Sequence, residues 1–588
     1  MRKLYTYSFV LASLICASSC NLDVEPPTSI SAETFWKTEK DAWYALNACY
    51  RSMTAIDIYD EMTTDNAHSH KPWEGNFELV QNGGISTAAT YGSYSFGQVR
   101  NTNIFLKNVE GCTMDNQIKE RMKAEARFLR ALSYMRLTSY YGKVAIIEEP
   151  LSYTDPTVPR NSVEEVQAYI LKELAEVAQI LPEQYTGGYL QETSRITRGA
   201  AYALRARAAL YFGNYVEAES SARKVMDMGK YGLFRISSLN AKQQKEADEM
   251  ALYIDFEAKG IDKDSFTKGM FSYEGLWHRG NANASNPEFV LFREYSTDVS
   301  SLDVSRYTYM IPLQMSLDYG FSSYEPMQDL IDAYWDIDGK TLRTPISVDQ
   351  RKANYEKIWK QAKDMRDEEY NEFASSEKLM EYDYMNEFRN RDSRLYASMM
   401  FPFKGWHHSS KGSVLYYKWN PAWVNSNGNE SWTGYSYRKL VTVDPLMMDS
   451  YGYSTEPYPV IRYAEVLLTF AEARTMNIGY DAEVKAALND LRDRCGMPKV
   501  PEALSKDQAI ELIRNERRIE LAAEGHRYND IRRYGKDYAR KVMTGASTAP
   551  DGSVVIQKAW DDKLMLMPIP QSAMDKNPLL KDDQNPGY

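Results

Sequence analysis

Residues 196–230 read ITRGAAYALRARAALYFGNYVEAESSARKVMDMGK, and this stretch decides the fold class. Alanine and apolar residues recur at helical spacing on both sides of Gly213 and Asn214. Because glycine and asparagine commonly end helices, the stretch predicts two helices joined by a short turn at these two positions.

The small residues of this predicted helix pair resemble the close-contact positions of a tetratricopeptide repeat. They are Ala206, Ala218, Ala222 and Val225, whereas Arg205 and Ala209 depart from the repeat consensus. Two further helix pairs are predicted at 117–181 and 459–495. Three pairs in one chain favour a stacked helical array over a single bundle.

Apolar spacing and caps support helices outside the pair at 196–230. One apolar stripe begins at a Ser162–Glu165 capping box and is stopped by Pro182. A second capped run begins at Ser505 with Gln508 and continues to Gly525. The same helical spacing recurs at Ile461, Ala464, Leu468 and Ala471.

Helical periodicity breaks down in three stretches, at roughly 57–95, 230–325 and 400–457. Connections this long are uncommon unless they are functional or disordered. These stretches are rich in aromatic residues, which disfavours disorder. We therefore expect ordered loops that carry function.

The three stretches combine tryptophan with polar side chains, in DNAHSHKPWEGNF at 65–77, GLWHRGNANASN at 275–286 and FKGWHHSS at 403–410. Carbohydrate sites need this mixture, because the apolar C–H face of a sugar lies on an aromatic ring while polar groups bind its hydroxyls. The predicted stacking platforms are Trp73, Trp277 and Trp406, and the predicted polar partners are Asn66, His278 and Arg279. The alternative is that these aromatic residues only pack the loops onto the helices.

Metal and catalytic signatures are sparse. The possible ligand pairs are His68 with His70 and His407 with His408, but no HExxH motif accompanies them. The chain also lacks the GxSxG motif, the Walker loop and the dinucleotide-binding fingerprint. We expect no metal, no cofactor and no enzymatic activity. Glycoside hydrolysis needs only two suitably spaced carboxylates, which leave no sequence motif, so a surface glycosidase stays an alternative.

Residues 1–19 predict a signal peptide, in which Arg2 and Lys3 precede a short apolar stretch and small residues before Cys20. A cysteine at this place is typical of bacterial lipoprotein signals, whose thiol is acylated and becomes the new N-terminus. Ordinary secretion with an incidental Cys20 is the alternative. No later segment reaches transmembrane length, so the sequence predicts a protein that is anchored to a membrane by lipid.

Charge and cysteine content exclude other classes of protein. Removing residues 1–19 takes the net charge from −11 to −13, and an acidic chain is a poor candidate for binding nucleic acid. The other mature cysteines, Cys49, Cys112 and Cys495, lie far apart and show no CxxC spacing. We expect them to be small buried hydrophobes and not a disulfide framework.

The C-terminal third contains the sequence segments with the clearest family resemblance. It contains YPVIRYAEVLLTFAEAR at 458–474, LNDLRDRCGMP at 488–498, NERRIELAAEGHRYNDIRRYG at 515–535 and MPIPQSAMDKNPLLKDDQNPGY at the end. These segments resemble the signature segments of the SusD/RagB family, in order, and FVLFREY at 289–295 resembles a strand of that family. Charged residues of the third segment are expected to form ion pairs that hold helices together: Glu516, Arg517, Glu520, Glu524 and Arg527.

The resemblance implies a mainly α fold, in which tetratricopeptide-like helix pairs form a superhelical scaffold that supports a loop-rich second part with few short strands. It places the mature chain in one unit, 20–588. The scaffold is expected mainly at 30–56, 95–230 and 458–535, and the loop-rich part mainly at 57–94, 231–457 and 536–588.

The resemblance also implies a function. Members of this family are lipoproteins of the cell outer membrane that face the exterior and deliver a ligand to a SusC-like TonB-dependent transporter, and the anchor would be Cys20. Their ligands are usually glycans and occasionally peptides, so a peptide receptor of the same fold stays an alternative. A pure assembly protein, whose loops touch only the transporter, is another. No family motif fixes the binding residues, so the predicted site rests on the loop argument alone.

Overall fold

The fold was obtained as a computed structural model. It describes residues 35–51, 53, 58–71, 73–152, 155, 157–185, 194–278, 280–283, 285–295, 321–409, 412–424, 429–441, 443 and 457–588. The predicted signal peptide, the predicted anchor Cys20 and the predicted polar partner Arg279 lie outside these residues.

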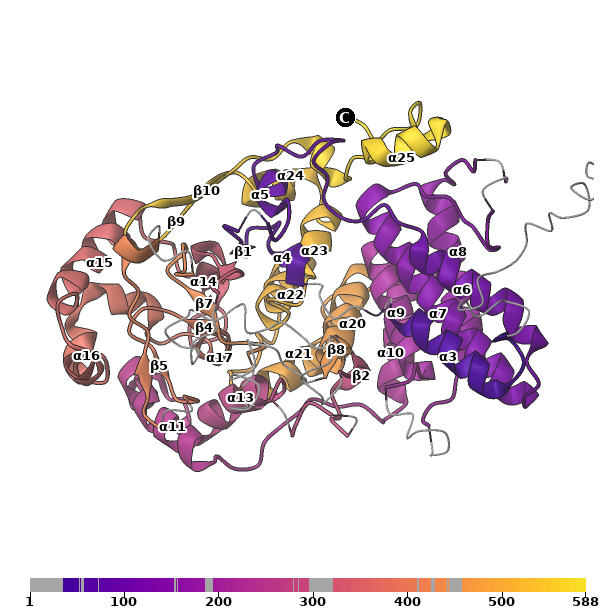
Figure 1. Cartoon of the computed structure of the whole chain (residues 1–588). Coiled ribbons are helices and arrows are strands. Elements are labelled where there is room, and N and C mark those ends of the chain that lie inside the picture. Colours follow the sequence, from indigo (N-terminus) through magenta and orange to yellow (C-terminus); the bar gives the residue numbers. More distant parts are fainter. Residues whose placement is uncertain are drawn as a thin grey trace, which may run out of the picture.

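Paired helices form one side of the molecule, on the right of Figure 1. The first part of the array consists of α3 (Glu39–Tyr50), α6 (Gly97–Asn108), α7 (Asn116–Tyr141), α8 (Val163–Ile180), α9 (Arg198–Tyr211) and α10 (Tyr215–Asp227). Helices α7 to α10 each pack against the next in the chain. The mainly α architecture predicted from the helix pairs is therefore confirmed.

The predicted turn between α9 and α10 forms as expected. Gly213 has a φ of +75°, a left-handed conformation that glycine adopts without steric cost. Asn214 caps α10 by accepting a hydrogen bond from the Glu217 amide at 3.1 Å. The Ser162–Glu165 capping box at the start of α8 is also present.

The C-terminal third returns to extend the array. It forms α20 (Tyr463–Asn477), α21 (Ala482–Arg494) and α22 (Lys506–Glu520). Helix α20 packs against α10 on one side and against α21 and α22 on the other, so these helices lie between the two sides of the molecule (Figure 1).

One part of the predicted helix at 459–495 is a strand. Ile461 was expected on its apolar face but lies in β8 (Tyr458–Arg462), which pairs antiparallel with β2 (Phe289–Arg293). Every residue of β8 is buried, and a short run buried on both faces cannot be told from a helix by its spacing. The strand predicted from FVLFREY is confirmed.

The loop-rich side contains more helix than expected. Helices α11 (Ala241–Tyr253) and α13 (Lys263–Gly275) occupy a stretch predicted to be non-helical. Apolar spacing does not predict helix α11, because its buried face carries Glu246, an ionised residue, at a position where the helical pattern needs an apolar one.

Further helices and strand pairs lie on the left, in the centre and along the top of Figure 1. The helices are α4 (Ile58–Glu61), α5 (Phe77–Gln81), α12 (Phe256–Lys259), α14 (Gln328–Ala333), α15 (Val348–Ala362), α16 (Asp367–Ala374), α17 (Ser393–Ser398), α23 (Arg527–Arg533), α24 (Lys536–Val542) and α25 (Gln571–Lys576). The antiparallel strand pairs are β1 (Ala67–His68) with β3 (Glu325–Pro326), β4 (Met399–Met400) with β7 (Ser436–Tyr437), β5 (Gly405–Trp406) with β6 (Leu415–Tyr416), and β9 (Gly545–Thr548) with β10 (Val554–Lys558).

A buried ion-pair network joins the two sides. The Glu520 carboxylate accepts hydrogen bonds from Arg394 of α17, Arg462 of β8 and Arg494 of α21. Arg462 also binds Glu524 at 2.8 Å. The structural role predicted for the charged residues of segment 515–535 is thus confirmed.

Two smaller findings complete the fold. Among the described residues, no helix is both long enough and apolar enough to cross a bilayer. Cys49, Cys112 and Cys495 are buried free thiols, as predicted.

Candidate functional site

Two of the three predicted platforms, Trp277 and Trp406, are buried. They expose 5% and 2% of their surface, so neither offers a ring face to a sugar, and the prediction of platforms there is wrong for this structure. Their rings instead pack against buried cations that are paired with carboxylates. The Lys439 ammonium lies 5.0 Å from the ring of Trp277, and the Arg438 guanidinium lies 5.7 Å from that of Trp406.

Two predicted polar partners are also internal. Asn66 donates a hydrogen bond to Glu61 at 2.6 Å and accepts one from Arg518 at 2.7 Å, which uses its side chain within the fold. His278 is buried, and burial lowers its pKa to about 4. These contacts assign Asn66 and His278 to the interior and not to an open site.

Trp73 is different, because 75% of its surface is exposed. It follows β1 and is flanked by Lys71, whose ammonium lies 5.6 Å from the ring, and by Glu74. Glu74 accepts a hydrogen bond from the Tyr324 hydroxyl at 3.0 Å. A large exposed indole held beside fixed polar groups has the composition of a sugar platform.

A cavity of about 680 Å³ begins at the residues that follow Trp73. Aromatic rings make up part of its wall, and Tyr59 stacks on Phe77 with ring centres 5.9 Å apart. Helix α7 supplies the opposite wall through Arg136 and Tyr140. Pockets of this size admit a drug-sized ligand, so the cavity has room for a short oligosaccharide.

Polar groups in this cavity are held by the fold. The Asp60 carboxylate accepts hydrogen bonds from the hydroxyls of Tyr91 and Tyr140, at 2.6 and 2.7 Å. Asn76 donates to the Thr90 carbonyl at 2.7 Å. A ligand would therefore meet prearranged polar groups and aromatic edges, an arrangement suited to hydroxyl-rich molecules.

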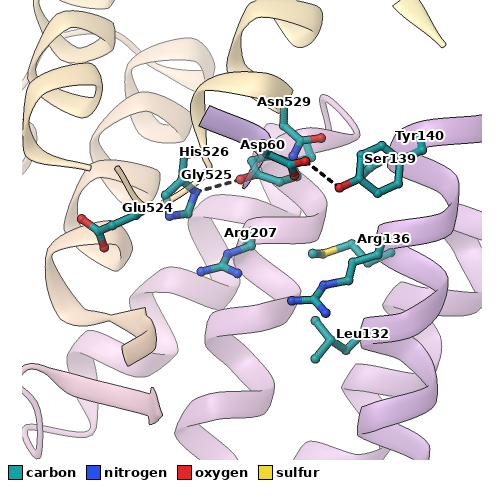
Figure 2. A pocket seen from close by; sticks show the side chains of 12 residues that line it. Asp60, Leu132, Arg136, Ser139, Tyr140, Arg207, Glu524, Gly525, His526 and Asn529 are labelled. Carbon is teal, nitrogen blue, oxygen red and sulfur yellow. Dashed lines mark hydrogen bonds between the residues drawn. The ribbon is translucent and has the colours of Figure 1, made fainter. Parts of the chain in front are cut away.

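A smaller cavity of about 40 Å³ shares Asp60, Arg136 and Tyr140 with the larger one. Figure 2 shows the Asp60–Tyr140 hydrogen bond together with Arg207 and His526 at this second cavity. It has room for a few water molecules and is too small for a sugar ring.

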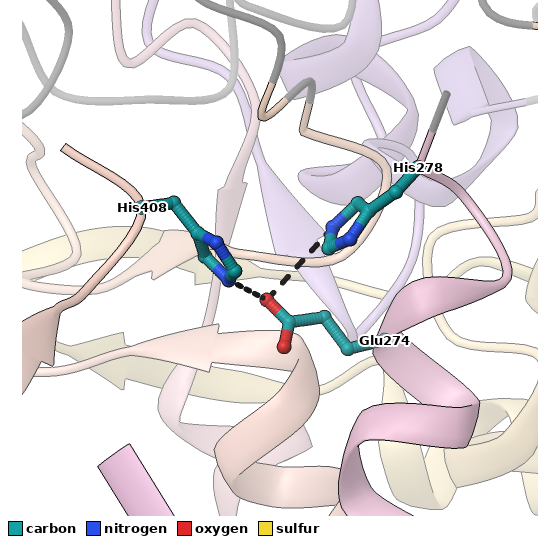
Figure 3. A group of neighbouring side chains, drawn as sticks. All are labelled: Glu274, His278 and His408. Carbon is teal, nitrogen blue, oxygen red and sulfur yellow. Dashed lines mark hydrogen bonds and ion pairs between the residues drawn. The ribbon is translucent and has the colours of Figure 1, made fainter. Parts of the chain in front are cut away.

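Glu274, His278 and His408 form the cluster shown in Figure 3, in which one ligand atom from each lies within 4.8 Å of the others. Arg438, however, donates to both Glu274 oxygens at 2.7 and 2.8 Å, and one of its nitrogens lies 3.4 Å from the His408 Nε2. A guanidinium in this position repels a cation and uses the carboxylate. We therefore describe the cluster as part of a second group of buried ion pairs, centred on Arg438, which also binds Glu246. The expectation of no bound metal stays a prediction.

The remaining histidines of the two pairs considered as metal ligands also have partners within the fold. His68 contacts Gln81 and His407 contacts Glu249, at 2.9 and 3.0 Å. His70 contacts Glu325 at 2.6 Å.

Sequence patterns did not identify the residues of the cavity next to Trp73. Tyr59, Tyr91 and Tyr140 come from three separate segments and carry no shared motif. The high tyrosine content, 44 residues, was the one general signal that some rings would line a surface.

Comparison with known proteins agrees with this fold. A model of the SusD family matches residues 287–588, and a model described as starch-binding and associating with the outer membrane matches residues 22–210. The SusD-like protein P38 of Formosa agariphila is 23% identical over 551 residues, which cover 90% of each chain.

Solved structures show the same architecture. A SusD-like protein of Bacteroides fragilis superposes with a TM-score of 0.72 at 24% identity, over 96% of this chain and 100% of the other. A SusD-like carbohydrate-binding protein of the same organism gives a TM-score of 0.68 at 22% identity, over 93% of this chain and 100% of the other. A laminarin-binding SusD-like protein gives 0.61 at 20% identity, over 94% and 100%. From the family match over more than half of its length and the shared architecture, we conclude that the chain belongs to the SusD family.

Proposed function

We propose that the protein is a cell-surface receptor that binds a glycan at Trp73 and in the adjoining 680 Å³ cavity. The observation that carries this proposal is the 75% exposure of Trp73 directly beside a cavity of aromatic and prearranged polar groups. The carbohydrate-binding and laminarin-binding relatives support the same class of ligand.

The expected affinity follows from the apolar area that stacking removes from water. One ring that buries about 100 Å² contributes roughly 2.5 kcal/mol at ~25 cal/mol per Å². Two rings, Trp73 and one tyrosine of the cavity, contribute about 5 kcal/mol. If polar contacts offset the entropic cost of association, this free energy corresponds to a Kd on the order of 0.1–1 mM. Weak and reversible binding suits a receptor that passes its ligand on.

The finer parts of the proposal concern the membrane. We propose that acylated Cys20 anchors the mature chain to the outer membrane with the site facing the exterior, and that a SusC-like TonB-dependent transporter receives the glycan. The family description that mentions association with the outer membrane supports this location. Metabolic labelling with a fatty acid tests the anchor, since Cys20→Ala should abolish labelling. Co-purification of a barrel-type transporter with the tagged native protein tests the partner.

Affinity electrophoresis and calorimetry against neutral and acidic polysaccharides test the binding role. Trp73→Ala should weaken binding to any glycan hit by about 10- to 50-fold, because it removes roughly 2 kcal/mol of stacking. Trp423→Ala is the matched control, since Trp423 is also exposed, at 40%, and does not line the cavity.

Other outcomes have clear meanings. Binding of peptides with no glycan bound would replace the proposal by a peptide receptor of the same fold. Release of reducing sugar from a bound polysaccharide, lost when Asp60 or Glu74 is replaced by its amide, would indicate a glycosidase.

A further inference from the structure

Lys71 lies beside the exposed Trp73, yet it is itself buried, with 4% of its surface exposed. Its ammonium has one long hydrogen bond, 3.4 Å to the Asn429 side-chain oxygen. Within the described residues, no carboxylate oxygen lies within 4.0 Å of the Lys71 nitrogen. Buried charges are normally paired, but the described residues give the Lys71 N–H donors no anionic acceptor.

The nearest acidic groups are occupied by other donors. One Glu325 oxygen contacts His70 at 2.6 Å, and the other accepts from the backbone amides of Trp432 and Thr433 at 2.7 and 2.8 Å. Glu74 accepts from Tyr324. Burial lowers the pKa of Lys71, and the charges of Glu325 and Glu74 oppose that shift only from a distance.

Within the described residues, His70, which precedes Lys71 in the chain, and Trp432 each carry a polar atom without a partner. His70 stacks on Trp432 with ring centres 4.7 Å apart. In the part of the chain that the structure describes, the buried His70 Nε2 and Trp432 Nε1 have no hydrogen-bond partner. Buried polar atoms of this kind are costly unless a ligand or water satisfies them. Lys71, His70 and Trp432 therefore form one incompletely satisfied group next to the Trp73 platform.

We propose that Lys71 is the anion-binding group of this site, so that the preferred ligand is an acidic glycan. A sugar ring would lie on Trp73 while its carboxylate or sulfate group receives hydrogen bonds from the Lys71 ammonium and the Trp432 indole N–H. Both groups are anionic oxygen acceptors, so the structure favours the shared chemistry, uronic acid or sulfate ester. This inference rests on the proposed glycan-binding function and adds the charge of the ligand.

Matched pairs of polysaccharides test the inference by calorimetry on the full mature chain. Polygalacturonate is compared with its methyl ester, and a sulfated galactan with its chemically desulfated form. The wild type should bind the acidic member of at least one pair at least about tenfold more tightly, because a charged hydrogen bond is gained. Lys71→Met should remove this preference, and Lys71→Arg should keep most of it. Lys172→Met is the control, since Lys172 is 73% exposed on α8 of the scaffold.

Each outcome decides a separate question. A preference for polygalacturonate identifies a carboxylate as the anion, and a preference for the sulfated galactan identifies a sulfate ester. Equal binding of acidic and neutral members, unchanged in Lys71→Met of normal melting temperature, would overturn the inference and leave glycan binding intact. Absence of binding to every polysaccharide would instead remove the proposed function together with the inference.

Discussion

At the scale of single residues, the buried Glu520 carboxylate is the shared partner of three arginines. Burial alone would raise its pKa, but Arg494, Arg462 and Arg394 outweigh burial and hold the pKa far below its usual value. The three elements that carry these arginines, two helices and one strand, thereby meet at one carboxylate. The interaction belongs to the scaffold, because none of these groups lines the cavity beside Trp73.

Removal of this charge should destabilise the protein strongly. Glu520→Gln leaves three buried arginines undercompensated, which should cost at least about 3 kcal/mol in the free energy of unfolding. Urea denaturation measures the loss. Glu502→Gln is the control, since Glu502 is 85% exposed in its pair with Lys485 and should change stability by less than about 0.5 kcal/mol. Equal effects of the two variants would contradict the structural role of Glu520.

Titration of Glu430 should lower the stability of the protein as the pH rises. Burial, followed by the charge of Glu325, raises its pKa from 4.5 to about 8. Between these values the folded carboxyl keeps a proton that the unfolded chain releases, so the free energy of unfolding falls as the pH rises from 4.5 to 8.

Glu430→Gln keeps the neutral shape and removes this loss. The variant should be more stable than the wild type by roughly 1–3 kcal/mol near pH 8, and equally stable near pH 4. Denaturation midpoints at the two pH values measure the difference. A stability difference that does not change with pH would show that Glu430 is not the titrating group.

At the scale of elements, the crossing of α13 and α21 depends on a glycine. A Cβ at Gly269 of α13 would overlap the backbone carbonyl of Cys495, just after α21. The two helices pack together, and α13 also packs on α17. Close backbone approach of this kind explains why α13 accepts a glycine in its interior despite the loss of helix propensity.

Gly269→Ala should therefore separate the two helices. Backbone cannot give way as a flexible side chain does, so we expect a loss of several degrees in melting temperature, corresponding to about 2 kcal/mol or more. Gly232→Ala is the matched control, because a Cβ there meets no atom within 4 Å and the backbone has no positive φ. Melting curves that agree for both variants would contradict the close crossing.

Whether a helix or strand can be predicted from the sequence depends on which side chains lie on its buried face. Helix α8 was predicted because its buried face is apolar and its capping box is intact. Helix α11 was not, since Glu246 of its buried face pairs with Arg438, a residue 192 positions away. Strand β8 was missed because both of its faces are buried. Local spacing reports apolar burial, and it says nothing about charges that are neutralised by distant partners.

At the scale of the whole molecule, the site depends on which loops meet. From the sequence alone, Trp73, Trp277 and Trp406 are equivalent candidates for a stacking platform, since each lies in a predicted loop near a histidine. The structure separates them, because Trp277 and Trp406 lie against buried, paired cations whereas Trp73 stays exposed. The rings of the cavity come from segments separated by tens of residues, so only the assembled scaffold brings them together.

A crystal structure of the mature protein with a bound oligosaccharide, taken from the tightest glycan of the binding panel, shows directly whether the ligand binds at Trp73 and in the adjoining cavity. We expect a sugar ring parallel to the Trp73 indole, with the next residue of the glycan in the cavity between Tyr59 and Tyr140. A glycan bound elsewhere on the molecule, with Trp73 and the cavity free of ligand, would contradict this expectation.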